Sequence, residues 1–121
     1  ATITAYNNCD YWLNELLKYI NNNIKYIIDY LNKNIPILKC DMPDGAYFAW
    51  IDYSKLNITE EVFQKYLIEI GKVAIMSGST YGIEGKTFLR INCACSINKI
   101  KDCMNRISDT IEYMKSNNII K

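Results

Sequence analysis

Residues 73–95 read V-A-I-M-S-G-S-T-Y-G-I-E-G-K-T-F-L-R-I-N-C-A-C, and their second half alternates like a β-strand. One face would carry Leu89, Ile91, Cys93 and Cys95, and the other Phe88, Arg90, Asn92 and Ala94. We expect the first face to pack against the core and the second face to line a polar or recessed surface. Arg90 is therefore a permanent cation in an otherwise apolar strand. It needs an anionic partner, because leaving a buried charge unpaired costs about 3–5 kcal/mol.

The neighbouring segments predict a small sheet. Residues 72–76 form a short predicted strand, 77–86 a glycine-punctuated loop, and 87–95 a longer strand. The short connection between these two strands favours antiparallel pairing. The aromatic-rich residues 46–52 predict a third strand, and residues 37–40 a possible fourth.

Three amphipathic helices are predicted around this sheet. The first has an apolar stripe with Asp10 as its expected N-cap, and it should end before Pro36. The stripe consists of Leu13, Leu16, Leu17, Ile20, Ile24, Ile27, Ile28 and Leu31. Thr59 should cap a second helix, which ends at Gly71. Ser96 should cap a third helix, and residues 117–121 after it should be frayed.

This order of elements predicts one domain, residues 1–121, with a two-layer α+β fold. A small, antiparallel-dominated sheet of three to four strands would be covered on one face by three helices. The chain starts with Ala1 rather than Met, which predicts a fragment of a longer protein.

Composition excludes several classes of function. The net charge of +1, without runs of either sign, argues against a nucleic-acid or membrane-surface partner. The absence of histidine excludes Ser-His-Asp and Cys-His catalysis and histidine metal sites. Five cysteines without a C-x-x-C pair predict a reduced, cytoplasmic protein with no bound metal.

Three segments together resemble a known family. They are Ala5-Tyr6 with Trp12-Leu13-x-x-Leu16; Pro43-x-Gly45-Ala46-Tyr47-Phe48-Ala49-Trp50-Ile51-Asp52; and Val73-Ala74-Ile75-Met76-x-Gly78-x-x-Tyr81-Gly82-x-x-Gly85-x-x-Phe88-x-Arg90-Ile91-Asn92. They resemble the C-terminal small domain of fold-type I pyridoxal-phosphate (PLP) enzymes of the class I/II aminotransferase superfamily. The details are most similar to the MalY/PatB-type branch of cystathionine β-lyases and related aminotransferases.

The resemblance implies specific roles. Arg90 would bind the α-carboxylate of the amino-acid substrate, while Gly78, Tyr81 and Gly82 would lie on a loop at the active-site mouth. Ser77 departs from the family, which often has proline there. The substrate would be a sulfur-containing amino acid such as cystathionine or cysteine, and the full-length enzyme a PLP-binding homodimer.

The resemblance also implies what this chain lacks. The Schiff-base lysine, the aspartate that pairs with the pyridine nitrogen and the phosphate-binding residues belong to a preceding N-terminal large domain. No catalytic and no cofactor-binding residue is therefore expected in this chain, and the fragment alone should be inactive and bind no PLP.

Three alternatives stay open at this stage. The sequence does not separate a lyase from a transaminase, because both would use the same carboxylate contact. A stand-alone α+β module that binds or senses a small carboxylate at Arg90 is the second possibility. In the third, a purely structural domain, Arg90 would pair internally with Asp52.

Overall fold

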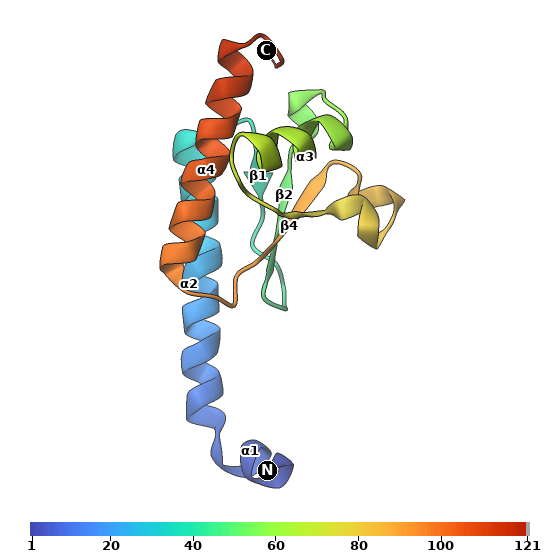
Figure 1. The fold of residues 1–121 in the computed structure, drawn as a ribbon. Coiled ribbons are helices and arrows are strands. Elements are labelled where there is room, and N and C mark those ends of the chain that lie inside the picture. Colours follow the sequence, from blue (N-terminus) through green and yellow to red (C-terminus); the bar gives the residue numbers. More distant parts are fainter. Residues whose placement is uncertain (121) are drawn as a thin grey trace.

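The computed structural model of the chain describes residues 1–120 and has an α+β fold, as predicted (Figure 1). Its elements are α1 (Thr2–Asn8), α2 (Asp10–Asn34), β1 (Lys39–Cys40), β2 (Phe48–Asp52), α3 (Glu60–Glu69), β3 (Met76–Ser77), β4 (Phe88–Asn92) and α4 (Ile97–Ser116). Short 3₁₀ turns occupy η1 (Ser54–Leu56), η2 (Gly78–Tyr81) and η3 (Ile83–Gly85).

The four strands form one sheet in the order β1-β2-β4-β3, and every neighbouring pair is antiparallel. Arg90 lies opposite Trp50 of β2 on one side and opposite Met76 of β3 on the other. The long helices α2 and α4 run side by side along one face of the sheet, and α3 packs against α4 (Figure 1). Among residues 1–120, no helix covers the other face of the central strands (Figure 1).

The core confirms the predicted alternation of β4. Leu89 and Cys93 are fully buried and Ile91 is nearly so, whereas Arg90 is half-buried and Asn92 is exposed. The helices contribute the opposing layer: Ile20, Ile24, Ile27 and Leu31 from α2, and Ile100, Met104, Ile107 and Ile111 from α4. Burying each such side chain contributes about 1.5–3 kcal/mol, so this layer holds β4, and with it Arg90, in place.

The first helix differs from the prediction at its start. Asp10 is the first residue of α2 and not its N-cap; Cys9 holds that position, and its side chain accepts no capping hydrogen bond. Residues 2–8 form α1, a helix that was not predicted. The predicted end before Pro36 is confirmed. The apolar stripe is buried only from Ile20 onward, because the first turns of α2 extend beyond the sheet (Figure 1).

Both other predicted caps are confirmed. Thr59 accepts a hydrogen bond from the Val62 backbone N–H, and Ser96 one from that of Lys99, each at 3.4 Å. Gly71 follows α3, as predicted, but the left-handed residue there is Lys72, with φ 54°. Gly71 is instead required by space, since a methyl group on it would meet the side chain of Thr110 on α4.

The strands are shorter than predicted. Ala46 has φ 65°, which is incompatible with an extended strand, so β2 begins at Phe48. The Asn92 side chain accepts a hydrogen bond from the Ala94 N–H at 2.8 Å, a local turn that ends β4 at Asn92. Residues 72–75 do not pair in the sheet, and β3 is confined to Met76–Ser77.

The predicted fraying after α4 is wrong for the residues that the structure describes. The Ile119 N–H donates to Met114 O at 2.9 Å and the Asn118 N–H to Lys115 O at 3.0 Å, with Asn118 at φ 56°. This is a Schellman motif, and it folds Ile120 back into the core with 6% of its surface exposed. Lys121 lies outside the described residues.

Within residues 1–120, no helix is both long enough and apolar enough to span a lipid bilayer.

Candidate anion-binding site

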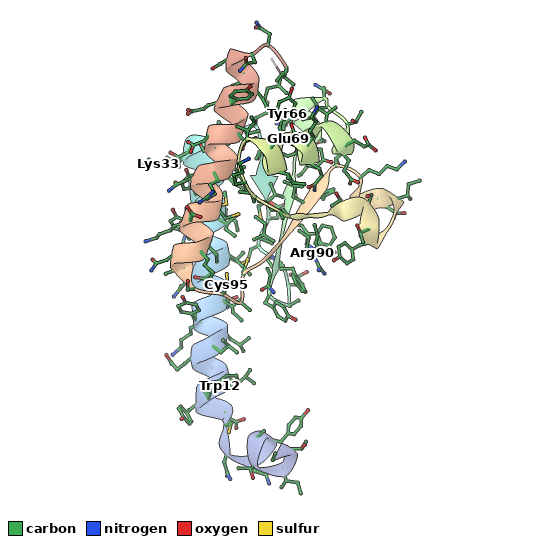
Figure 2. The ribbon with its side chains drawn as sticks, viewed as in Figure 1. Trp12, Lys33, Tyr66, Glu69, Arg90 and Cys95 are labelled. Atoms are coloured by element: carbon green, nitrogen blue, oxygen red, sulfur yellow. The ribbon has the colours of Figure 1, made fainter. Side chains whose placement is uncertain are left out.

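Arg90 projects from the middle of β4 on the sheet face that lies away from α2 and α4 (Figure 2). The alternation that buries Leu89 and Ile91 against the helices forces the side chain between them to the opposite side. Because β4 is a central strand, neighbours from both β2 and β3 flank the guanidinium group.

Two aromatic rings enclose the guanidinium group of Arg90. Its central carbon Cζ lies 4.1 Å from the centre of the Phe48 ring and 4.0 Å from the centre of the Tyr81 ring. Both contacts are within the range of cation–π interactions. We call Phe48 and Tyr81 the aromatic bracket of Arg90. The bracket thus packs two aromatic rings against the guanidinium group.

The N–H groups of Arg90 have one weak partner among residues 1–120. Arg90 Nη2 lies 3.5 Å from the thioether sulfur Sδ of Met76, and the Tyr81 hydroxyl donates to the same sulfur at 3.1 Å. A thioether is a weak acceptor. The remaining donors of a guanidinium fork are therefore available to an external acceptor.

No carboxylate of residues 1–120 forms an ion pair with Arg90. The internal pair with Asp52 is not formed, since the Asp52 carboxylate instead accepts a hydrogen bond from the Ser54 N–H at 2.8 Å. This contact belongs to the turn after β2. The structure therefore does not support a purely structural role in which Asp52 neutralises Arg90.

The three predicted loop residues differ in their relation to Arg90. Tyr81 contacts Arg90 directly and also packs edge-to-face on Trp50, with ring centres 5.7 Å apart. Gly78 and Gly82 shape the loop: Gly78 is buried where its backbone meets that of Gly85, and Gly82 has φ 138°.

Two residues of the site, Phe48 and Met76, were not identified as site residues from the sequence. Phe48 lies in the aromatic-rich strand predicted from the sequence, where core packing is the more frequent role of an aromatic residue. Its place on the same sheet face as Arg90 follows from the register of β2 on β4, in which Phe48 lies opposite Asn92. The position of Met76 depends on the pairing of β3, which alternation alone does not give.

A groove of about 370 Å³ adjoins Arg90 between β3, β4 and the start of α4. Its walls include Met76, Ile91 and Ile100, with Lys99 at the rim. An apolar groove with a cationic edge suits a small anion that carries an apolar portion.

Two thiols, Cys103 at the groove and Cys93 in the core, are poor nucleophiles and poor metal ligands. Burial raises the pKa of Cys103 from 9.0 to about 11, and that of Cys93 likewise to about 11, so both are neutral thiols near neutral pH. Within the described part of the chain, no three His, Cys, Asp or Glu side chains converge as a metal site would require.

Residues 1–120 do not fit a PLP site. A Schiff-base lysine needs a sheltered environment that lowers its pKa, yet every lysine side chain in residues 1–120 is exposed. None of them makes a cation–π contact with Phe48 or Tyr81. Residues 1–120 therefore offer no sheltered lysine as a covalent anchor for the cofactor.

Comparison with known proteins gives consistent matches. The family model for aminotransferase class I and II matches residues 1–107. The protein MalY of Escherichia coli K12 is 44% identical over 101 residues, which cover 84% of this chain and 26% of MalY. The cystathionine beta-lyase PatB of Bacillus subtilis is 33% identical over 107 residues, which cover 88% of this chain and 28% of PatB.

A solved structure shares the fold. The PLP-bound putative aminotransferase from Clostridium difficile 630 superimposes with a TM-score of 0.85 at 38% identity, over 88% of this chain and 28% of that protein. The chain thus spans about a quarter of the length of these relatives. The resemblance predicted from the sequence is confirmed, and the chain belongs to the aminotransferase class I and II family.

Proposed function

We propose that this chain is the substrate-carboxylate-binding small domain of a PLP-dependent enzyme that acts on sulfur-containing amino acids. The enzyme would be a C–S β-lyase of the cystathionine β-lyase type or a closely related aminotransferase. Membership of the aminotransferase class I and II family and the 33% sequence identity with PatB support this class of enzyme. The cofactor, the homodimer and an N-terminal large domain with the Schiff-base lysine are parts of the same proposal.

The observation that carries the proposal is the geometry of Arg90. Phe48 and Tyr81 both contact its guanidinium group, and among residues 1–120 its N–H groups have only the Met76 thioether as a partner. A carboxylate that approaches in the plane of the guanidinium group can accept two parallel N–H···O bonds. This geometry supports Arg90 as the residue that binds the α-carboxylate.

In this role the chain contributes positioning. Bound PLP supplies the electron sink of the reaction, and the residues described here hold one end of the substrate. A two-pronged contact at the carboxylate restricts rotation of the amino acid and so fixes the direction of its Cα–H bond. The fragment itself should be inactive, because its exposed lysines provide no cofactor anchor.

The direct test replaces Arg90 in the full-length protein. Arg90→Ala removes the carboxylate contact and should lower kcat/KM for a sulfur amino acid by roughly 10²- to 10³-fold, as expected for a lost charge-paired hydrogen bond. Arg106→Ala is the matched control, since Arg106 pairs with Asp102 on α4, away from the site. An unchanged KM in Arg90→Ala would refute the proposal.

A second experiment addresses the missing cofactor anchor. The 121-residue chain is mixed with PLP, reduced with borohydride and mapped by mass spectrometry. We expect scattered, weak labelling of exposed lysines and no Schiff-base absorbance band. Stoichiometric labelling of one lysine would contradict the proposed division of labour between this chain and a large domain.

The stand-alone binding module is the second candidate. It is favoured by the fact that Arg90, Phe48, Met76 and Tyr81 all come from this chain, so the cation site needs no other chain to form. Calorimetric titration of the isolated chain with amino acids separates the two candidates. Tight binding that is lost in Arg90→Ala would favour the module over the enzyme domain.

A further inference from the structure

We infer that Glu60 and Gln64 of α3 are positioning residues that hold the segment carrying Met76 and Tyr81 against Arg90. The inference deepens the proposed function and rests on it, because it assigns a task to residues that touch neither the substrate nor Arg90.

The contacts are polar and join α3 to Ile75 and to Ser79, on either side of β3. The Glu60 carboxylate accepts hydrogen bonds from both the backbone N–H of Ser79, at 3.3 Å, and the Ser79 hydroxyl. Gln64 donates its side-chain amide to the backbone carbonyl of Ile75 at 3.1 Å. Glu60 and Gln64 are four residues apart, so they lie on the same face of the helix.

The other main contacts of this segment are with β4 and η3. β3 pairs over only two residues and forms an edge of the sheet. Met76 is 48% exposed and Tyr81 44% exposed, so neither is fixed by burial in the core. The close backbone contact of Gly78 with Gly85 shapes the loop but does not attach it to a helix. The attachment to α3 comes from Glu60 and Gln64.

The consequence for Arg90 follows from its own contacts. Met76 and Tyr81 provide the sulfur partner and one of the two rings of Arg90. If the segment moves away, the guanidinium group keeps only Phe48 and recovers rotamer freedom that substrate binding must then remove. Loss of Glu60 should therefore weaken binding of the carboxylate and leave the chemical step nearly unchanged.

Glu61 offers a matched control. It adjoins Glu60 in the first turn of α3 and carries the same charge, so both stabilise the positive end of the helix dipole to a similar extent. Its carboxyl pKa is lowered by hydrogen bonds from its own backbone N–H and from Thr59, and it makes no contact with Ser79. Glu61→Ala thus removes the charge without releasing the segment.

The test measures Arg90 directly in the full-length protein. Phenylglyoxal modifies accessible arginines, and peptide mapping gives the rate at Arg90 relative to Arg106, the only other arginine of this chain. We expect Glu60→Ala to raise this ratio severalfold and Ser79→Ala to raise it less, because the Ser79 N–H contact survives. Glu61→Ala should leave the ratio unchanged. Glu60→Gln should stay near the parent, because an amide can accept from the Ser79 N–H and donate to its hydroxyl.

Kinetics with an amino-acid substrate supply the second readout. KM should rise on the order of tenfold in Glu60→Ala, in line with the loss of one cation–π contact and its orientation, while kcat stays within about twofold. Equal modification ratios in Glu60→Ala and Glu61→Ala would overturn the inference. The proposed function has its own test, since an unchanged KM in Arg90→Ala would refute it. The ratio of modification at Arg90 to that at Arg106 can be measured whether or not the proposed function holds.

Discussion

The side-chain amide of Asn23, in the middle of α2, donates a hydrogen bond to the backbone carbonyl of Cys93 at 2.9 Å. It also donates to the carbonyl of Cys95 at 3.0 Å, and only 1% of Asn23 is exposed. These carbonyls follow the end of β4, where the sheet provides no partner for that of Cys95. Asn23 therefore connects the helical layer to the strand that carries Arg90.

Asn23→Ala should lower the free energy of unfolding by about 1.5–3 kcal/mol, because one buried and one partly buried carbonyl group lose their donor. Asn22→Ala is the control, since Asn22 is exposed on the same helix. Chemical denaturation of both variants checks the expectation. A difference below about 0.5 kcal/mol between them, the usual effect of a surface substitution, would show that water replaces the amide at no cost.

Features that depend on the periodicity of apolar residues or on local capping rules could be predicted from the sequence. The alternation of β4, the end of α2 before Pro36 and the caps at Thr59 and Ser96 arise from local rules, and the structure confirms them. Asn23 escaped prediction because a polar residue beside an apolar stripe usually faces solvent. Its burial depends on two carbonyls seventy positions away in the sequence.

Only part of the site could be predicted, because some of its contacts join segments that are distant in the sequence. Arg90 was identifiable as a cation in an apolar strand, and Tyr81 through the family motif. The aromatic bracket needs the register of β2 on β4 and the path of the loop after β3, which are properties of the folded chain. The strand ends were misplaced because Ala46 and the Asn92 side chain impose local turns.

Gly78→Ala should disturb the loop that carries Tyr81. A methyl group on Gly78 would overlap the backbone carbonyl of Gly85, and backbone cannot yield as a flexible side chain can. We expect a loss of about 1–3 kcal/mol in the free energy of unfolding, typical of overpacking.

Gly45→Ala provides the comparison for this loop, since a methyl group there meets nothing within 4 Å. It should change stability by no more than about 0.5 kcal/mol. Both variants can be compared by thermal and denaturant unfolding. Equal stabilities of the two would show that the loop opens at this contact without penalty.

Phe48→Leu should weaken substrate binding by removing one ring of the bracket. The remaining side chain fills space but lacks the π-face that the guanidinium group contacts. In the full-length enzyme we expect KM for an amino-acid substrate to rise about 2- to 10-fold, with kcat little changed.

Phe88→Leu serves as the control for Phe48. Phe88 is half-buried on the same sheet face and packs edge-to-face on Trp50, with ring centres 6.2 Å apart. Its ring makes no cation–π contact with Arg90 among those that the structure shows. If both variants raise KM equally, general packing of this face, rather than the bracket, controls the site.

The buried thiols predict a loss of stability at alkaline pH. Burial raises the pKa of Cys40, Cys93 and Cys103 from 9.0 to about 11 each in the folded chain. The unfolded chain therefore releases these protons at lower pH than the folded chain. The stabilising contribution is complete below pH 9 and is lost as the pH rises through 11.

Cys93→Ala isolates one of these contributions. Cys93 is fully buried, so the substitution lowers stability by a constant amount at every pH below 9. Between pH 9 and 11, however, the free energy of unfolding should fall less steeply in the variant than in the parent. Tyr53, whose pKa burial raises to about 12, titrates in both proteins and cancels in the comparison. Urea denaturation at several pH values in this range gives the two slopes, and parallel slopes would show that the Cys93 thiol ionises as readily in the folded chain as in the unfolded one.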